Sequence, residues 1–167
     1  MNLEQRIVIT GMGAVSPVGL NCKETFSSLA EGRSGIDRIT SFDPSEITCH
    51  IAGEVKGFDP TDYMDRKMAR RIGRYAQFSI AATREALAQS GLDLEKEDPS
   101  RIACIVSSAI ADFPMVEDEM NKIFGQGKRH ISPFTVPRVS TSMAAGNIAL
   151  EFGLTGVSYS LSSACAT

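Results

Sequence analysis

Short β-branched runs and longer helical stripes alternate along the chain. Residues 6–10 (RIVIT) form a β-branched run that ends at Gly11 and predicts a buried strand. Residues 102–108 (IACIVSS) are almost continuously apolar, which is typical of a central parallel strand buried on both faces. Residues 157–162 alternate between apolar and serine positions, which predicts a strand with one packed face. An edge strand is expected near residues 51–55.

Helical periodicity fills the stretches between these strands. Asn21 with Glu24 three residues later predicts the start of one helix, which should end before Gly32. Residues 63–90 predict a second helix, apolar over much of its girth and therefore packed between layers. Residues 142–152 predict a helix of small side chains. Because strands alternate with helices, the pattern favours an α/β fold.

A further helix is predicted to begin near Asp112 and Pro114, and residues 132–137 are expected to form a stiff linker. In that helix the core-facing side chains should be Val116, Met120, Ile123 and Phe124, and the side chains facing water should be Glu117, Asp118 and Glu119.

Composition narrows the classes of protein that fit. Of the 167 residues, 43% are hydrophobic and 22% charged, as in an ordinary globular protein. No apolar run reaches the ~18 residues of a membrane span. The formal net charge of −3 disfavours a nucleic-acid partner, since such proteins are usually basic. The N-terminus has no secretory signal pattern, so we expect a cytoplasmic protein without a membrane association.

Cys165 is the most informative candidate for chemistry. It follows a predicted strand among side chains too small to shield it (SSACAT, residues 162–167). A helix beginning there would favour the thiolate, which is the nucleophilic form, and the backbone N–H of Cys165 could donate to an oxyanion. On periodicity alone a structural cysteine remains the favoured interpretation. Cys22 and Cys104 lie in apolar patterns and are expected to be buried, and the cysteines and histidines show no metal-ligand spacing.

Two other motifs have competing interpretations. Lys67, Arg70, Arg71 and Arg74 have the spacing of one helix face, which is either solvated or a docking site for an acidic partner or a phosphate. The Gly11-x-Gly13-x-x-Ser16 segment imitates a dinucleotide fingerprint but lacks its third glycine, and a proline follows. A turn that tucks the chain under the sheet is the better interpretation of that segment.

Several motifs together resemble the β-ketoacyl-acyl carrier protein synthases, and most closely the ketoacyl synthase II-like condensing enzymes of fatty acid synthesis. They are RIVITGMGAVSPVG at 6–19, SGI at 34–36, RKMARR at 66–71, ISPFTVP at 131–137, EFGLTG at 151–156 and SSACAT at the end. The resemblance implies a thiolase-like α-β-α-β-α sandwich and a homodimer in which the strand before the nucleophile pairs across the two-fold axis. It also implies a decarboxylating Claisen condensation without metal or organic cofactor, in which the phosphopantetheine arm of acyl carrier protein delivers the substrate.

The resemblance also implies roles for individual residues. Cys165 matches the catalytic nucleophile, and Ile110 matches a residue that lines the acyl pocket. Thr135 stands where a second phenylalanine often follows Phe134, and residues 107–112 replace a glycine-rich stretch, so no particular acyl length is implied. Lys67, Arg70 and Arg71 match positions at which family members dock the acidic carrier protein, and Arg129 is expected to join them. His130, next to Arg129, stands where a lysine is common.

Members of that family extend well beyond this length, and their catalytic histidines match neither His50 nor His130. We therefore expect residues 1–167 to be an incomplete N-terminal half of a ketoacyl synthase domain, ending just after the nucleophile and inactive alone. The alternatives are a non-catalytic ketoacyl-synthase-like fragment and a polyketide ketosynthase, each binding acyl carrier protein.

Overall fold

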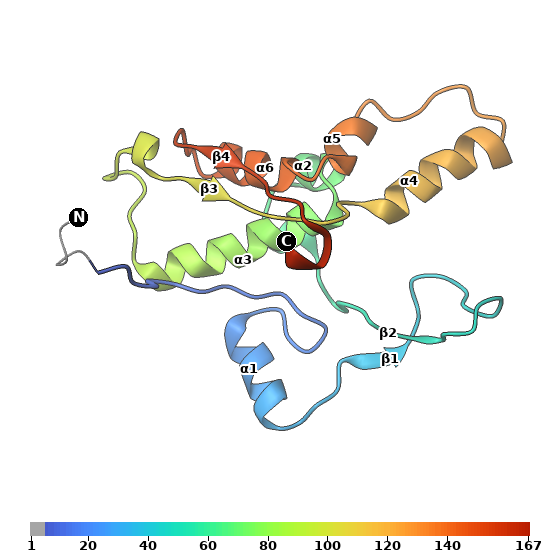
Figure 1. The fold of residues 1–167 in the computed structure, drawn as a ribbon, viewed down its shortest axis with the longest axis horizontal. Helices are drawn as coiled ribbons and strands as arrows, with labels where there is room; N and C mark the ends of the chain where they lie inside the picture. Colours follow the sequence, from blue (N-terminus) through green and yellow to red (C-terminus); the bar gives the residue numbers. More distant parts are fainter. Residues whose placement is uncertain (1–5) are drawn as a thin grey trace. The chain divides into compact units, whose positions relative to one another are not determined.

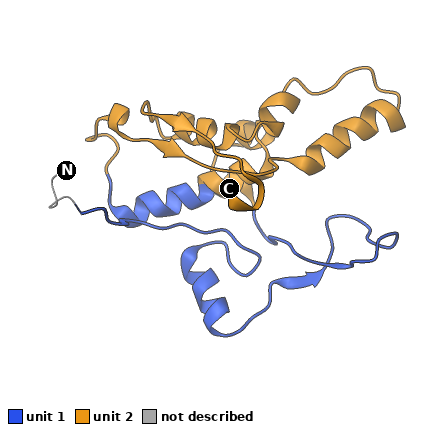
Figure 2. Cartoon of the chain, in the orientation of Figure 1, with its two compact units in different colours: residues 1–58, 81–92 blue, residues 59–80, 93–167 orange. Residues whose placement is uncertain are grey.

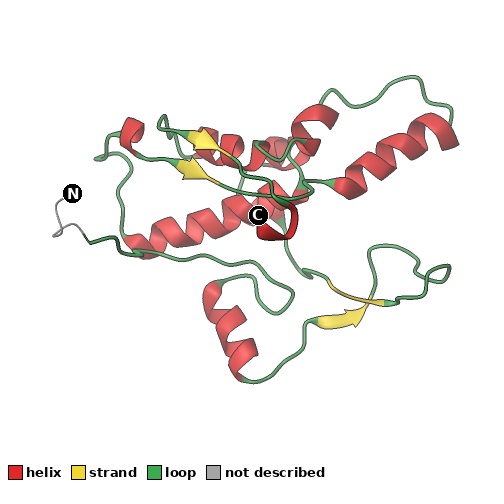
Figure 3. Cartoon of the chain, viewed as in Figure 1, coloured by secondary structure: helices red, strands yellow, loops and turns green. Residues whose placement is uncertain are grey.

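Helices and short strands alternate through residues 6–167, the part of the chain that the computed structural model describes (Figure 1, Figure 3). The α-helices are α1 (Cys22–Ala30), α2 (Arg66–Arg71), α3 (Arg74–Ser90), α4 (Phe113–Met120), α5 (Thr135–Val139) and α6 (Met143–Glu151). The strands are β1 (Ile36–Arg38), β2 (Ile51–Gly53), β3 (Cys104–Ile105) and β4 (Ser158–Tyr159). Single turns of 3-10 or π-helix are η1 (Pro60–Asp62), η2 (Pro99–Arg101), η3 (Asn121–Gly125) and η4 (Ala164–Ala166).

The described residues form two compact units (Figure 2). Unit 1 comprises residues 6–58 and 81–92, and unit 2 comprises residues 59–80 and 93–167. Helix α3 begins in unit 2 and ends in unit 1. The alternation of helices and strands agrees with the α/β class that the sequence predicts.

Unit 1 is built around close contact between an extended N-terminal segment and the second half of α3. A Cβ atom on Gly13 would stand 1.8 Å from the carbonyl oxygen of Ala82, and one on Gly11 would stand 2.0 Å from that of Ala86. Only glycine allows the two backbones to approach so closely. The segment therefore lies along a helix instead of turning under a sheet, and its glycines leave no space for a dinucleotide phosphate.

Glu85 of α3 holds this segment and the start of α1 together. Its carboxylate accepts hydrogen bonds from the backbone N–H of Ala14 at 3.0 Å and from that of Cys22 at 2.9 Å. A negative charge at the first turn of a helix satisfies N–H groups that have no partner within the helix. Asn21 caps the same helix by accepting from the N–H of Glu24 at 2.8 Å, which confirms the predicted start of α1.

The prediction of a strand at residues 6–10 is wrong. Those residues pair with no other strand among the described residues, and the side chains of Ile7, Val8 and Ile9 are exposed. The composition of the run favours a strand, but a strand also needs a neighbour to complete its hydrogen bonds. In α1 the apolar side chains of Phe26 and Leu29 are likewise exposed, whereas Ser28 is buried.

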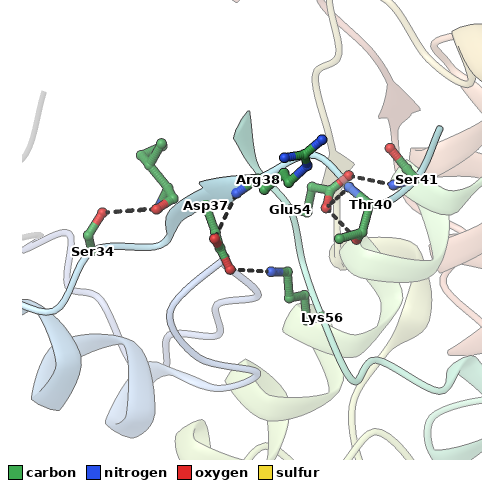
Figure 4. A network of polar contacts seen from close by, with 8 residues as sticks. Ser34, Asp37, Arg38, Thr40, Ser41, Glu54 and Lys56 are labelled. Carbon is green, nitrogen blue, oxygen red and sulfur yellow. Dashed lines mark hydrogen bonds and ion pairs between the residues drawn. The ribbon is translucent and has the colours of Figure 1, made fainter. Parts of the chain in front are cut away.

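The predicted edge strand exists as β2, which pairs antiparallel with β1. The Glu54 carboxylate accepts hydrogen bonds from the N–H and hydroxyl of Thr40 and from the N–H of Ser41 (Figure 4). Hydrogen bonds from Ser41 and Thr40 lower the pKa of Glu54 to about 2. Lys56 pairs with Asp37 at 2.8 Å in the same hairpin, so polar contacts hold these short strands in register (Figure 4).

Unit 2 has the larger apolar core. Ile80 of α3 and Ile148 of α6 are its largest fully buried side chains, and Ala144 and Ala145 of α6 are also fully buried. These small side chains let α6 pack closely, which confirms the predicted helix of small residues. The core is completed by Met64, Ala69, Ile72, Ala76 and Cys104.

The long helix predicted over residues 63–90 is interrupted between α2 and α3. Ile72 ends α2 with an extended backbone (φ −106°, ψ 155°) and buries its side chain in the core. At Gly73 a Cβ atom would stand 2.9 Å from both the Cβ of Asp112 and the ring of Tyr75. The break therefore comes from packing against a residue distant in sequence, which helical periodicity does not contain.

The two-stranded parallel sheet of unit 2 joins the strands predicted at residues 102–108 and 157–162. Cys104 pairs with Ser158 and Ile105 with Tyr159. Cys104 is buried, as expected, whereas Ile105 is 53% exposed. The expected burial on both faces is thus wrong for β3 among the described residues, although its parallel pairing is confirmed.

Helix α4 turns a different face to the core from the one that periodicity indicates. Met115 is buried, while Met120 and Phe124 are exposed. Glu119 is buried because its carboxylate accepts from the N–H of Ser132 at 3.0 Å and pairs with Lys122 at 2.8 Å. The expected linker at residues 132–137 instead contains the start of α5.

Candidate active site

The candidate nucleophile lies in an exposed turn after the parallel strand pair. Beyond β4, the N–H of Leu161 donates to the hydroxyl of Ser107 at 3.3 Å, so the chain follows β3 for two more residues. It then forms the η4 turn, in which Cys165 is exposed. Side chains at the carboxyl ends of parallel strands point to the region where α/β proteins bind ligands.

The turn presents Cys165 through an unusual backbone. Ala164 has φ +51°, and it is the one residue other than glycine with a positive φ among residues 6–167. The turn is closed by hydrogen bonds from the N–H of Ala166 to Ser163 and from that of Thr167 to Ala164, both at 3.1 Å. The N–H of Cys165 takes part in neither of these two hydrogen bonds. Among the described residues Cys165 lies in this single turn of 3-10 helix.

The other thiols differ from Cys165 in environment. Cys104 is buried and donates to the carbonyl of Ala145 at 3.4 Å, and its burial raises the pKa of the thiol. Partial burial, and secondarily the Glu85 carboxylate, raise the pKa of Cys22. Both shifts favour the unreactive thiol. Cys49 is exposed like Cys165, and it belongs to unit 1, whereas Cys165 belongs to unit 2.

The two residues expected to line an acyl pocket are placed on neighbouring segments of unit 2. Ile110 is 68% exposed in the bend before α4. Thr135 begins α5, and its hydroxyl is buried without a hydrogen-bond partner among residues 6–167. Among the described residues, no hydrogen bond or ion pair joins either of them to Cys165.

An ion pair that the sequence did not indicate connects these two segments. Asp112, two residues after Ile110, pairs with Arg138 of α5 at 3.0 Å, and the Asp112 side chain is 7% exposed. Tyr75 donates its hydroxyl to the carbonyl of Ser140 at 2.6 Å, and its pKa is raised by burial and then by the charge of Asp112. One feature of the sequence could have indicated that Asp112 and Arg138 have partners: each is the single charged residue in a stretch of otherwise apolar or small side chains, 107–112 and 135–140.

Three of the four predicted docking cations lie together. Lys67, Arg70 and Arg71 are exposed on α2, whose first turn is capped by the Asp65 carboxylate. The sequence also predicts Arg74 on the same helix face as these three. Arg74 instead lies on α3, beyond the break at residues 72–73, so the helix face of α2 has three cations and not four. Arg129 is exposed in the loop after η3, and no contact places it beside α2.

A hollow of about 310 Å³ lies beside these cations in unit 2. The guanidinium of Arg71 stacks over the Phe134 ring at 5.1 Å, which restricts the side chain. The walls combine cationic, apolar and acidic side chains: Asp65, Lys67, Met68, Arg71, Ile72, Asn147, Leu150 and Glu151.

Within residues 6–167, no cluster of three or more acidic, histidine or cysteine side chains could hold a metal ion. In the same range no helix has both the length and the apolar character needed to cross a membrane.

The fold of the chain has solved relatives. The ishigamide ketosynthase/chain length factor superposes with a TM-score of 0.85 at 24% identity, over 93% of this chain and 39% of that one. A β-ketoacyl synthase from Burkholderia phymatum superposes with a TM-score of 0.78 at 27% identity, over 97% of this chain and 40% of that one. The chain thus has the thiolase-like fold of the ketosynthases.

Sequence comparison identifies the family. The profile of the β-ketoacyl synthase N-terminal domain matches residues 4–167, and the chain belongs to this family of condensing enzymes. It is 38% identical over its whole length to 3-oxoacyl-[acyl-carrier-protein] synthase 2 of Staphylococcus aureus, and 38% identical over 164 residues to the Vibrio harveyi protein of the same name. The chain spans 40% of the length of these relatives.

Proposed function

We propose that this chain supplies the nucleophile of a β-ketoacyl-acyl carrier protein synthase of fatty acid biosynthesis, with Cys165 carrying the acyl group. The observation that carries the proposal is the exposed thiol in the turn after β4, in a chain that belongs to the family. Cys165 and Cys49 are the two exposed cysteines, and of these Cys165 lies in the SSACAT segment, directly after the parallel strand pair.

The proposed reaction has two stages. The Cys165 thiolate attacks the thioester carbonyl of an acyl carrier protein, and the sulfur of the carrier leaves as a thiolate. Malonyl carrier protein then loses carbon dioxide, and the resulting carbanion attacks the acyl-cysteine carbonyl and releases the thiolate. In both stages an oxyanion develops, and we propose that the N–H of Cys165 donates to it. That this N–H takes part in neither hydrogen bond of the η4 turn supports the role.

In the proposed reaction the Cys165 thiolate and the carbanion left by decarboxylation are the two nucleophiles, so we propose neither a metal nor an organic cofactor of the enzyme; the phosphopantetheine arm belongs to the carrier. We propose that Lys67, Arg70 and Arg71 dock this acidic partner and that Arg129 contributes a separate contact. The three cations exposed together on α2 support this role. One ketosynthase of the same fold was solved in complex with its acyl carrier protein.

We further propose a homodimer in the cytoplasm. Among the described residues strand β4 pairs only with β3, so its other edge carries no strand and could pair with a second copy. The four cysteines are all free thiols, as in a reducing compartment.

The test uses two matched variants of the full-length protein, since Cys49 and Cys165 are both exposed. After incubation with acyl carrier protein, peptide mass mapping should find the acyl group on Cys165. Cys165→Ala should abolish acylation and condensation without changing the melting temperature, and Cys49→Ala should leave both unchanged. Acylation of Cys22, Cys49 or Cys104 with Cys165 unmodified would contradict the proposal. Carrier binding without any acylation would support a non-catalytic module instead.

A further inference from the structure

We propose that a hollow beside α1 in unit 1 binds the phosphate group of a small phosphomonoester, with Arg33 and Lys56 as the cationic contacts. The hollow measures about 320 Å³, and its walls come from residues 16–20, α1, residues 33–34 and Lys56. All of these belong to unit 1, whereas Cys165 belongs to unit 2. The inference is therefore independent of the proposed function.

A second hollow, of about 450 Å³, adjoins the first, since Arg33 and Glu24 line both. Lys23 lines the second hollow and Lys56 the first. The two hollows together thus present three cations and one carboxylate, although the chain as a whole has a formal net charge of −3. A concave surface with an excess of one charge attracts ligands of the opposite charge.

The walls of the first hollow are held by contacts within unit 1. Ser28 is buried, and its hydroxyl donates to the carbonyl of Val18 at 2.7 Å. A Cβ atom on Gly35 would stand 2.8 Å from the Val18 side chain, so the two segments pack tightly. Glu24 accepts from the N–H of Leu20 at 2.9 Å, which ties α1 to the same loop. Walls that are in place before a ligand arrives reduce the ordering cost of binding.

Both cations are positioned by carboxylates that are not part of the lining of the hollow. Arg33 Nη2 pairs with Glu31 at 2.9 Å. Lys56 Nζ pairs with Asp37 at 2.8 Å (Figure 4). A guanidinium and an ammonium group each have several N–H donors, so one ion pair leaves others for a ligand.

The chemistry of the walls favours a phosphate ester over a bare anion. A guanidinium and an ammonium group from separate segments can bind different oxygens of one phosphate, and the Ser34 hydroxyl belongs to the same wall. Pro17, Val18 and Leu20 add an apolar part to the lining. Small-molecule sites have volumes of roughly 300–1,000 Å³, so this hollow admits a compact organic group beside the phosphate.

The experiment is a saturation-transfer difference NMR titration of the full-length protein with phenyl phosphate, with inorganic phosphate and phenol as competitors. We expect phenyl phosphate to bind. Inorganic phosphate should displace it only at about tenfold higher concentration, because the free ion gains nothing from the apolar wall, and phenol should not displace it.

Variants of the two cations identify the site. The Arg33 side chain is 60% exposed and that of Lys56 49%, and an exposed charge contact contributes a factor of up to about five. Arg33→Gln/Lys56→Gln should therefore weaken the binding of phenyl phosphate by about tenfold. Arg33→Lys keeps the charge and should weaken it less than Arg33→Gln does.

Lys96→Gln is the matched control. Lys96 pairs with Asp93 at 2.6 Å and is likewise exposed, but it lines neither hollow. This variant should leave the affinity for phenyl phosphate unchanged. Absence of saturation transfer, unchanged affinity in the double variant or an equal loss in Lys96→Gln would overturn the site. Displacement by inorganic phosphate at the same concentration would overturn the assignment of an ester, and displacement by phenol would overturn that of a phosphate.

Discussion

Gly13 lies where α3 leaves no room for a side chain. A Cβ atom there would stand 1.8 Å from the carbonyl oxygen of Ala82, so Gly13→Ala must move backbone and not merely a flexible side chain. We expect this variant to lower the free energy of unfolding by about 1–3 kcal/mol, the usual cost of overpacking. Thermal unfolding measures the effect.

Gly146 is the control for this prediction. It lies within α6, and no heavy atom comes within 4 Å of the position its Cβ would take. Alanine is the better helix former, so Gly146→Ala should raise the stability by up to about 1 kcal/mol. Equal destabilisation by the two substitutions would mean that the approach of Gly13 to α3 is not tight.

At the scale of residues, the sequence indicates what depends on near neighbours. Asn21 caps α1 as its spacing predicts, and Gly91 and Gly153 follow helix ends with positive φ. The helical pattern predicts that Glu119 faces water. It does not reveal the burial of Glu119, because the N–H group that binds the carboxylate belongs to Ser132, 13 residues away. Arg138 is 26 residues from Asp112, so neither periodicity nor local charge pattern could join them.

Among the elements, α2 offers the clearest test of partner binding. Exposed ion pairs contribute about 0.2–1 kcal/mol each, so reversing Lys67, Arg70 and Arg71 to Glu should raise the KM for carrier-linked substrate by roughly tenfold or more. The salt dependence of that KM should flatten, since the cations that salt screens are gone. Steady-state kinetics across a range of salt concentrations measures both.

A triple reversal elsewhere separates docking from net charge. Arg33, Lys96 and Arg101 are exposed, and changing them to Glu alters the formal charge by the same amount. This control should leave the KM for carrier-linked substrate near its original value. If both triple variants behave alike, α2 is a solvated helix face and not a docking site.

Element boundaries show where sequence patterns stop being sufficient. The sequence predicts β3 from the almost continuous apolar run at residues 102–108, and β4 from the alternation of apolar and serine positions at residues 157–162. The sequence does not predict the break at Ile72, because an extended residue there is stabilised by burial in the core and by the approach of Asp112 to Gly73. Tertiary packing overrides helix propensity at such positions.

For the whole chain, we expect residues 1–167 expressed alone to associate and not to condense acyl groups. Large apolar side chains are exposed in unit 2, among them Leu150 at 78%, Phe124 at 81% and Val157 at 67%. Exposed apolar groups of this size favour association. The reaction also needs general acid–base help of typically ~10²–10⁴-fold, and His50 is instead bonded to the carbonyl of Ile47 in unit 1.

Light scattering and a malonyl decarboxylation assay check the two parts separately. Leu150→Lys should reduce association if the exposed apolar side chains cause it. A monomeric, cooperatively melting chain with turnover would contradict both parts of the prediction, and would require catalytic residues within the chain other than those proposed.

The backbone at Ala164 restricts which mutations evolution can accept beside the nucleophile. With φ +51°, an L-residue pays about 1–2 kcal/mol, and β-branched or bulky side chains pay most. Glycine and asparagine take this conformation more readily than other residues. The backbone of the turn therefore disfavours β-branched side chains beside Cys165 for a reason that is independent of the chemistry of the thiol.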